Sequence, residues 1–431
     1  MGFATNKFFG LLALCAVACA ETVAPVQHPH HAPLPPIADD PNDFSATFGE
    51  STPEAEGVDP RALMQLAAWV RDQDPPIFSV LISRHGKLIF ELYTSQLGRD
   101  EAHYLMSVTK SFTSALVGIA IDKKLLRDEN ESLAEALPKN AFATAGDVER
   151  FRPVTIKDVL GMSALDAPVF PHQKDEFARA RLKGFTAARN KLVFALSQNI
   201  LPEPGKSFLY TDVTPILATG IVELAAHETA FDFAKRNLFD PLGFRNAEWM
   251  HEDAAGIDNG AYGLRLRPID MQKFGVLYLR HGQWNGTQII SDAWVTTSFT
   301  PWIQSEGSPH DSGKPNYGSY WWQQTFGALT AHVANGWKGQ RIAVVPSEDL
   351  VVTMTAVIEN GGEEKIFAKL MTDLVAPALR STPLALDANA DSALRALLDD
   401  VRANTLNIHE TLEKRMIPTI EAKGKRHPLA L

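Results

Sequence analysis

The sequence predicts an α/β protein in which both ends of the chain build one antiparallel sheet, flanked by helices, around an inserted and mostly helical lobe. Three observations predict it. A helical pattern and two strand patterns stand near the start of the chain. Two strand patterns and a helical pattern stand near its end, and helix starts alternate with Pro or Gly stops from about 124 to 290. Strands that follow one another closely form antiparallel hairpins, so the two pairs are expected to share a sheet.

The elements at the two ends follow from their residue patterns. PRALMQLAAWVRD, which ends at Asp72, places apolar residues at helical spacing. FSVLISR and HGKLIFELYT are apolar strands joined by a tight turn at His85-Gly86. Later, RIAVVP and LVVTMTAV flank a turn at 347–349, and GEEKIFAKLMTDLVAPAL is expected to form a last helix.

The composition is that of a folded globular protein with an acidic surface. Of 431 residues, 45% are apolar and 21% are charged, and the formal net charge is −10. This charge argues against a nucleic-acid partner, and the basic run KGKRH near the C-terminus is interpreted as solvated. We expect one large domain over 46–380, with its helical lobe at about 124–290, and a charged, loosely attached helical tail over 381–431.

The N-terminus is predicted to be a targeting segment. One lysine precedes the apolar run FFGLLALCAVACA, which ends in Ala18-Cys19-Ala20. These features are typical of a signal peptide over 1–20, followed by a Pro- and His-rich linker over 21–45. Export to the periplasm or the medium is therefore expected, and the mature chain would contain no cysteine. The alternative is a lipoprotein, held on a membrane by a lipidated Cys19.

The segment HYLMSVTKSFTSALVGIAID carries the strongest chemical signal. Ser107 stands where a helix is expected to begin, and Lys110 follows three residues later, so the two side chains share one helix face. A serine hydroxyl becomes a nucleophile when a base removes its proton, and a lysine amine can be that base. The backbone N–H of Ser107 would be free to stabilise an oxyanion. A capping serine and a surface lysine are the alternative interpretation.

Further segments extend this signal. In order they are PEPGKSFLYTD, GLRLRPIDMQKFGVLYLRHGQWNG, NYGSYWW and NGWKGQRIAVVPSEDLVVTMT. Together with the Ser107 segment they resemble the serine β-lactamase and penicillin-recognising superfamily, and above all its class C branch with esterases and 6-aminohexanoate-dimer hydrolases. The resemblance covers about residues 50 to 380 and implies a β-lactamase-like fold. It also implies that Tyr210 is a second base, which relays protons to and from Ser107; a packed core tyrosine is the alternative.

Two positions depart from the pattern of that family. Its Tyr-x-Asn appears here as Tyr210-Thr211-Asp212, and an ionised Asp212 near Lys110 would raise the pKa of that lysine and hold it charged. In Ala334-Asn335-Gly336 the usual leading cation is absent. Asn335 and Gly336 are still expected at the substrate or oxyanion site, with backbone N–H groups between 336 and 339 as donors. Both changes argue against substrates anchored by a carboxylate.

Several neighbouring residues have an open role. His332 and Lys338 are candidates for the missing cation, although each is interpreted as a surface residue. Tyr104 and His103 either line the pocket or pack beneath it. Trp321, Trp322 and Trp337 are candidates for an apolar acyl-binding wall, with at least one expected in the core. The loop at 166–185 is expected to set specificity.

These residues predict an exported serine hydrolase that cleaves an amide or ester through an acyl-enzyme on Ser107. The alternatives are a β-lactamase or penicillin-binding D-Ala peptidase and, in another class, a ligand-binding relative without turnover. The expected partner is a small-molecule amide or ester, and a membrane is a partner only if Cys19 is lipidated. No metal or organic cofactor is implied. The sequence leaves the substrate and the oligomeric state open.

Overall fold

The computed structural model describes most of the chain between residues 49 and 404. The gaps within this range are residues 74, 95–97, 168–182, 252–255, 307–312 and 360. The expected signal peptide over 1–20 and linker over 21–45 lie outside the described residues. So do the tail after residue 404 and most of the loop at 166–185.

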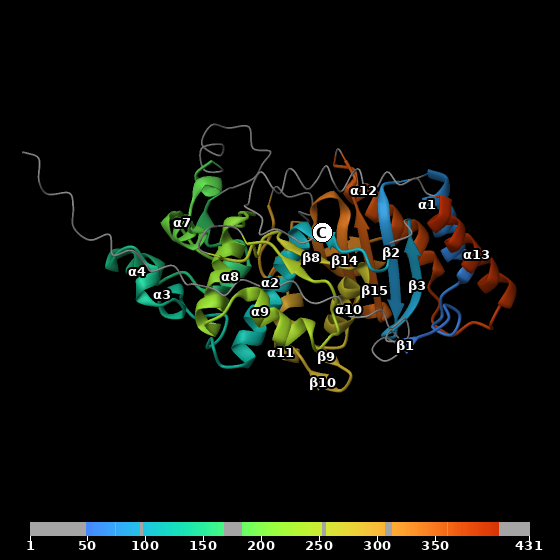
Figure 1. Ribbon diagram of the computed structural model, residues 1–431, viewed down its shortest axis with the longest axis horizontal. Coiled ribbons are helices and arrows are strands. Elements are labelled where there is room, and N and C mark those ends of the chain that lie inside the picture. The colour runs from blue at the N-terminus through green and yellow to red at the C-terminus, as the bar shows by residue number, and fades with distance from the viewer. Residues whose placement is uncertain are drawn as a thin grey trace, which may run out of the picture.

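Eight strands form the central sheet, in the order β1-β3-β2-β15-β14-β13-β12-β11. Their bounds are β1 (Gly49–Glu50), β2 (Ile77–Arg84), β3 (Lys87–Tyr93), β11 (Tyr317–Gly318), β12 (Trp321–Phe326), β13 (Leu329–Gly336), β14 (Gln340–Val345) and β15 (Leu350–Ala356). Strand β2, from the start of the chain, pairs with β15, from its end (Figure 1). Neighbours are antiparallel except β1 and β3, which pair in parallel. The predicted sheet from both ends of the chain is therefore confirmed.

Tight turns join the two central hairpins. His85 and Gly86 connect β2 to β3 with φ angles of 51° and 75°. Positive φ at both central residues is the type I′ arrangement, which matches the twist of the flanking strands. Between β14 and β15, Asp349 also has a positive φ, of 48°. Turns are thus present at both places where the sequence predicts them.

Helices pack on both sides of the sheet. α10 (Pro268–Leu279) contacts β2, β14 and β15, whereas α13 (Ala388–Asn404) contacts β3 and α1 (Pro60–Gln73). In Figure 1 the strands lie between α10 on one side and α1 and α13 on the other. Gln272 fixes α10 to the sheet, because its amide donates to Ser83 Oγ (2.9 Å) and to the carbonyl of Val351 (3.1 Å).

The helix α13 corrects one prediction. The segment after residue 380 was expected to be loosely attached, yet Leu394 and Val401 are buried against the body of the protein. An ion pair of 2.5 Å also joins Asp387, just before the helix, to Arg61 on α1. The prediction is wrong for this helix because its larger apolar residues face inwards: Leu394 and Val401 are buried, and Leu397 and Leu398 pack partly buried against the core. Its many charged residues lie on the outer side and gave the segment its tail-like composition.

The middle of the chain forms a helical lobe around α2 (Thr109–Asp122). The other helices are α3 (Leu133–Ala136), α4 (Ala145–Phe151), α5 (Ile156–Leu160), α7 (Lys191–Ser197), α8 (Val213–Ala226), α9 (Ala230–Ala234) and α11 (Asp292–Phe299). Short sheets join β5 (Leu165–Asp166) to β6 (Asn199–Ile200), β9 (Gln283–Trp284) to β10 (Thr287–Gln288), and β8 (Leu264–Leu266) to both β4 (His103–Tyr104) and β7 (Glu248–Trp249). α2 packs against α8 and also touches β13, so it lies where the lobe meets the sheet (Figure 1).

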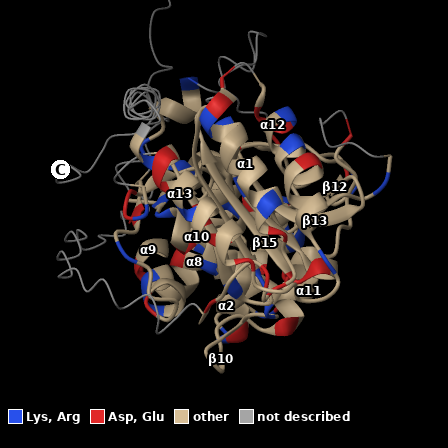
Figure 2. Cartoon of the chain, turned by 90° about the vertical axis from the view of Figure 1, so that its right-hand side faces the viewer, with Lys and Arg blue, Asp and Glu red and all other residues tan. Residues whose placement is uncertain are grey.

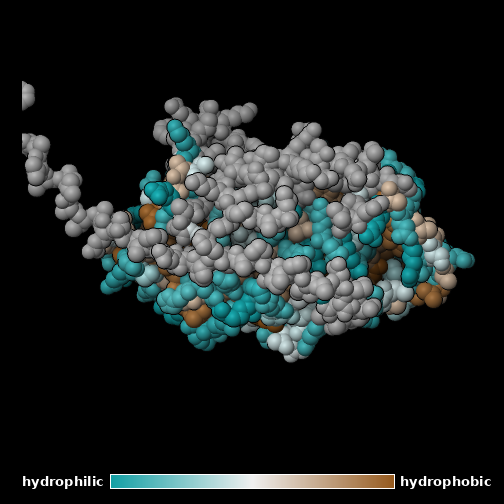
Figure 3. All heavy atoms as spheres, viewed as in Figure 1, coloured by the Kyte–Doolittle hydropathy of each residue, from teal (hydrophilic) through white to brown (hydrophobic). Residues whose placement is uncertain are grey.

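The described surface is polar and carries charges of both signs. Figure 2 shows Lys and Arg interspersed with Asp and Glu over helices such as α13 and α12 (Glu363–Lys369). The described residues in Figure 3 are mostly hydrophilic, with apolar residues scattered among them. In the part of the chain that the structure describes, no helix combines the length and the hydropathy that crossing a membrane requires.

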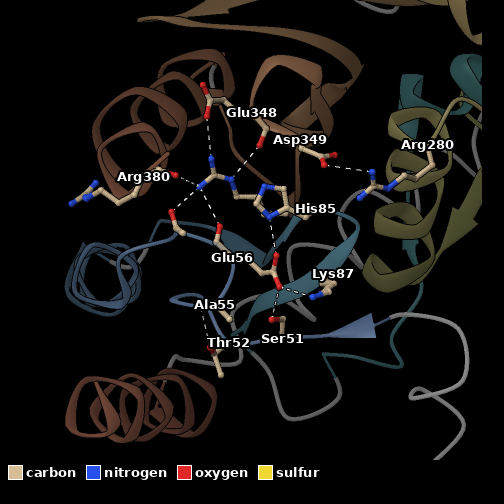
Figure 4. A network of polar contacts seen from close by, with 12 residues as sticks. Ser51, Thr52, Ala55, Glu56, His85, Lys87, Arg280, Glu348, Asp349 and Arg380 are labelled. Carbon is tan, nitrogen blue, oxygen red and sulfur yellow. Dashed lines mark hydrogen bonds and ion pairs between the residues drawn. The ribbon is translucent and has the colours of Figure 1, made fainter. Parts of the chain in front are cut away.

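A polar network around Glu56 holds the β2–β3 turn (Figure 4). The Glu56 carboxylate lies 2.8 Å from Lys87 Nζ, 2.7 Å from Ser51 Oγ and 2.8 Å from His85 Nδ1. Burial by itself raises the pKa of Glu56, but the hydrogen bonds from these three side chains outweigh it and lower the pKa to about 2. The ionised carboxylate therefore stabilises the fold at neutral pH.

Glu56→Gln is expected to lower the free energy of unfolding by about 2–3 kcal/mol at pH 7. Because the pKa of Glu56 is about 2 when folded and near 4.5 when unfolded, this stabilisation is present above pH 4.5 and is lost as the pH falls towards 2. Urea unfolding of variant and wild type should thus differ at pH 7 and nearly coincide at pH 2. Glu149→Gln, in an exposed pair with Arg152, is the control and should change little. An equal loss at both pH values would contradict the role of the ionised form.

Candidate active site

Ser107 lies in a short 3₁₀ turn, Met106–Val108, immediately before α2. Met106 has a φ of 49°, a left-handed conformation that is costly for a residue with a side chain. No side chain caps α2, so Ser107 is not the capping serine of the alternative interpretation. The Ser107 side chain remains partly exposed. The strained turn presents a hydroxyl where the lobe meets the sheet.

Lys110 is a buried residue that points back at Ser107. Its side chain is 2% exposed, which excludes the surface lysine of the alternative interpretation. Its Nζ donates to Ser107 Oγ (2.8 Å), to Asp212 Oδ1 (2.9 Å) and to the carbonyl of Ala261 (2.8 Å). An ammonium group has three N–H donors, so these three acceptors, together with the further interaction with Tyr210, leave no donor of Lys110 unengaged.

Tyr210 and Asp212 complete the group from the start of α8. The Tyr210 ring centroid lies 5.0 Å from Lys110 Nζ, and the ring stacks on Trp322 at 6.0 Å. Asp212 is the residue immediately before α8 and is mostly buried. The fold thus brings Ser107, Lys110, Tyr210 and Asp212 together, as the sequence predicts.

The charge of Lys110 decides what this group can do. Burial by itself lowers the pKa of Lys110, but the charge of Asp212, followed by Tyr210 and hydrogen bonds to both, outweighs burial and raises the pKa above 10.5. This agrees with the effect expected of Asp212. A charged lysine with all three donors engaged cannot accept the proton of Ser107. In this state Lys110 places a positive charge 2.8 Å from the Ser107 hydroxyl.

A turn that the sequence analysis missed supplies the third acceptor for Lys110. Asn259 Oδ1 accepts the backbone N–H groups of Ala261 and Tyr262, both at 2.9 Å. Gly260 has no room for a side chain, since a Cβ there would lie 1.9 Å from Thr219 Oγ1. The turn thereby directs the Ala261 carbonyl at Lys110. The Asn-Gly pair in IDNGAYG was the available signal, because it is typical of a tight turn.

The end of β13 lies against the Ser107 turn. A Cβ on Gly336 would approach the carbonyl oxygen of Leu105 to 2.5 Å and Val108 Cγ2 to 3.2 Å, so only glycine fits. The backbone after Gly336 is thus placed beside Ser107, as an oxyanion site requires. Asn335 differs, because its amide donates to Glu364 Oε1 (3.2 Å) on α12.

Neither candidate for the missing cation is a free surface residue. His332 stacks on Phe299 at 4.0 Å, and burial lowers its pKa to about 4, so it is neutral at pH 7. Lys338 is buried, and its Nζ lies 2.5 Å from Glu359 Oε1. The interpretation of Lys338 as a surface residue is therefore wrong, and His332 is half-buried beside Phe299 of α11.

Some of the remaining aromatic candidates lie in the core, and others lie beside Tyr210 or Gly336. Trp321 packs in the core against Tyr278 (4.8 Å). Trp322 stacks on Tyr210, and Trp337, next to Gly336, is 40% exposed. Tyr104 is buried in a small cluster that includes Met106. At least one tryptophan is thus a core residue, as expected.

The residues described hold no group of three or more His, Cys, Asp or Glu side chains placed to bind a metal ion. His103, the other candidate for the pocket, packs against Phe78, and the two rings stack with their centroids 5.0 Å apart. The chemistry of the site is that of a hydroxyl, an ammonium, a carboxylate and a phenol.

Known proteins share this architecture. A model of the beta-lactamase family matches residues 64–374, whereas no curated protein sequence matches the chain. A structure from Bacillus anthracis assigned as a 6-aminohexanoate-dimer hydrolase superposes with a TM-score of 0.60 at 16% identity, covering 77% of this chain and 87% of its own.

Two further structures have the same fold. EstCE1, a hydrolase with promiscuous acyltransferase activity, gives a TM-score of 0.54 at 18% identity and covers 69% of this chain and 94% of its own. A class C beta-lactamase gives 0.53 at 12% identity, with 74% and 96% covered. With the family model spanning most of the sequence, and with a serine beside a buried lysine at its centre, the chain belongs to the beta-lactamase family of serine hydrolases.

Proposed function

We propose that this protein cleaves an amide or ester bond of a small molecule through an acyl-enzyme on Ser107. One observation carries the proposal: Lys110 Nζ lies 2.8 Å from Ser107 Oγ inside a group that also contains Tyr210 and Asp212. The serine is partly exposed, so a carbonyl can approach it.

The roles follow from the charges. Ser107 Oγ attacks the carbonyl carbon, and its proton passes to the Tyr210 oxygen as the phenolic proton moves to the leaving group. The bond to the leaving amine or alcohol breaks, and Ser107 retains the acyl group. Water then attacks the ester, the same relay runs in reverse, and Ser107 regains its proton. Throughout, Lys110 stays charged and stabilises negative charge on the oxygens of Ser107 and Tyr210.

Amides and esters are favoured over β-lactams. Asp212 can only accept hydrogen bonds when ionised, and Ala334 provides no cation for a substrate carboxylate. The similar structures named as a 6-aminohexanoate-dimer hydrolase and as a hydrolase with acyltransferase activity support the same choice.

Labelling and turnover test the proposal together. A fluorophosphonate probe is expected to label the protein, and peptide mass spectrometry should locate the label on Ser107. A panel of p-nitrophenyl butyrate, an anilide amide and a chromogenic cephalosporin is expected to show turnover of the ester or the amide.

Ready turnover of the cephalosporin with inert ester and amide would instead favour a β-lactamase. A folded sample that neither labels nor turns over any substrate would favour a ligand-binding protein and refute the proposal.

A further inference from the structure

Arg341 is a buried cation beside the site for which the sequence patterns give no role. It lies on β14, opposite Asn335 on β13, and its side chain is fully buried. One terminal nitrogen, Nη1, donates to the carbonyls of Gly336 (2.5 Å) and Gln340 (2.9 Å). The other, Nη2, donates to Glu364 Oε1 at 2.7 Å. The guanidinium thus holds both ends of the turn that joins β13 to β14.

A charge at this position is unfavourable for the fold alone. Burial lowers the pKa of Arg341, whereas Glu364 and Glu363 raise it, and the effect of burial is the larger. The unfavourable desolvation of the guanidinium therefore exceeds its favourable interactions with these neighbours. Its Nε has no hydrogen-bond partner in the described part of the chain. An apolar side chain of similar length would fill this space without that penalty. A buried cation that is poorly compensated and lies close to a reactive group points to a functional role.

The carbonyl of Gly336 connects Arg341 to the site. Gly336 packs against the turn that carries Ser107, since a Cβ there would lie 2.5 Å from the oxygen of Leu105. The peptide between Gly336 and Trp337 is trans, as are all described peptides. In a trans peptide the C=O and N–H point in opposite directions. Because the carbonyl faces Arg341, the N–H of Trp337 is presented on the other side.

We propose that Arg341 is a positioning residue of the oxyanion hole. By binding the Gly336 carbonyl it fixes the N–H of the same peptide as a donor to the oxygen of a carbonyl bound at Ser107. A hydrogen bond to the C=O of a peptide also polarises its N–H, by about 10–30% in hydrogen-bond strength. A donor that is already oriented needs no rearrangement when negative charge develops. The inference rests on the proposed function.

Glu364 orients the guanidinium. Its Oε1 accepts from both Arg341 Nη2 and Asn335 Nδ2, and Glu364 lies on α12, outside the sheet. The Glu364 carboxylate thereby connects both β13 and β14 to α12 through hydrogen bonds. The side chain of Asn335 therefore contacts α12, although the next residue, Gly336, packs against the Ser107 turn.

The test is Arg341→Met, which keeps the length of the side chain and removes its charge and donors. With p-nitrophenyl butyrate we expect kcat to fall by about 10- to 100-fold, less than the loss of a direct oxyanion donor, with KM changed by less than about threefold. The affinity for an alkylboronic acid, which forms a tetrahedral anion on the serine, is expected to fall by the same factor as kcat. Arg341→Lys, which retains the charge and a donor group but not the planar fork of the guanidinium, should give a kcat between those of wild type and Arg341→Met.

Arg84→Met is the matched control. Arg84 is also a buried arginine of the sheet, and it donates to the carbonyls of Gly57 (2.7 Å) and Arg380 (2.9 Å). Its loss is expected to lower the melting temperature while kcat and boronate affinity stay within about twofold of wild type.

The outcomes are distinguishable. If Arg341→Met keeps kcat and boronate affinity as Arg84→Met does, Arg341 is only structural and the inference is wrong. If Arg341→Met does not fold, Arg341→Lys decides in the same way. A wild type that neither hydrolyses the substrates nor binds the boronate refutes the proposed function itself.

Discussion

Ser107→Ala is expected to reduce kcat/KM for an ester or amide substrate by about 10⁴-fold or more. Alanine removes the only atom that can form the acyl-enzyme, while Lys110, Tyr210 and the backbone donors stay in place. Steady-state hydrolysis of p-nitrophenyl butyrate measures the loss, and fluorophosphonate labelling should disappear with it. The melting temperature is expected to change little, because Ser107 caps no helix and water can replace its one hydrogen bond to Lys110.

Ser114→Ala is the control for this result. Ser114 lies on α2, which follows the Ser107 turn, seven residues further along the chain, and is fully buried. Its substitution should leave kcat/KM within about twofold of wild type. If Ser107→Ala kept more than about one percent of the turnover, another nucleophile would have to be sought and the assignment of Ser107 would fail.

Asp212→Asn is expected to destabilise the protein strongly at pH 7 and much less at pH 10. It removes the main group that raises the pKa of Lys110 and leaves burial, which lowers it. Breaking a buried pair from one side costs about 3–5 kcal/mol while the remaining charge persists. In wild type the raised pKa of Lys110 gives stability below 10.5 that is lost as the pH rises through the folded value. In the variant the lysine can lose its proton near pH 10, so the difference from wild type shrinks.

Urea unfolding at the two pH values measures this, and Asp270→Asn provides the contrast. Asp270 is fully buried and binds Arg267 through two hydrogen bonds of 2.8 and 3.0 Å. Arg267, which makes both hydrogen bonds, cannot lose its proton in this range, and Lys273 lies farther from the carboxylate at 3.9 Å, so the penalty of Asp270→Asn should change less between pH 7 and pH 10 than that of Asp212→Asn. If the destabilisation caused by Asp212→Asn were the same at pH 7 and pH 10, the titration of Lys110 could not be its cause.

The same substitution is informative for activity. With a lower pKa, Lys110 would lose its charge at high pH, and the alkaline limb of the kcat profile is expected to move to lower pH than in wild type. This shift would show that catalysis needs Lys110 as an ammonium, as the three engaged donors indicate.

Local features were predictable because they depend on residues that are close in sequence. The hairpin turn at His85-Gly86 needs only positive φ angles and alternating apolar strands. Ser107 and Lys110 meet because they are three residues apart on one turn. The partner roles of Tyr210 and Asp212 came from the resemblance, since nothing local says that they reach α2.

The incorrect predictions share one cause. Lys338 and His332 looked like surface cations, and α13 looked like a loose tail, because composition reports polarity and not burial. The role of Asn335 at the substrate site stays a prediction, and its side chain donates to Glu364 on a helix 29 positions away. Such contacts depend on how the sheet and helices pack.

By itself the sequence determined the order of helices and strands, the pairing of the two ends of the chain, and a serine one helical turn before a lysine. The sequence predicted that Asp212 would hold that lysine charged if the two lay close together, and only the tertiary structure decided that they do. Asp212 and Ala261 lie 102 and 151 positions from Lys110 and become its acceptors only through folding. Secondary structure follows from short-range sterics and periodicity, whereas the charge of a buried group depends on every dipole packed around it.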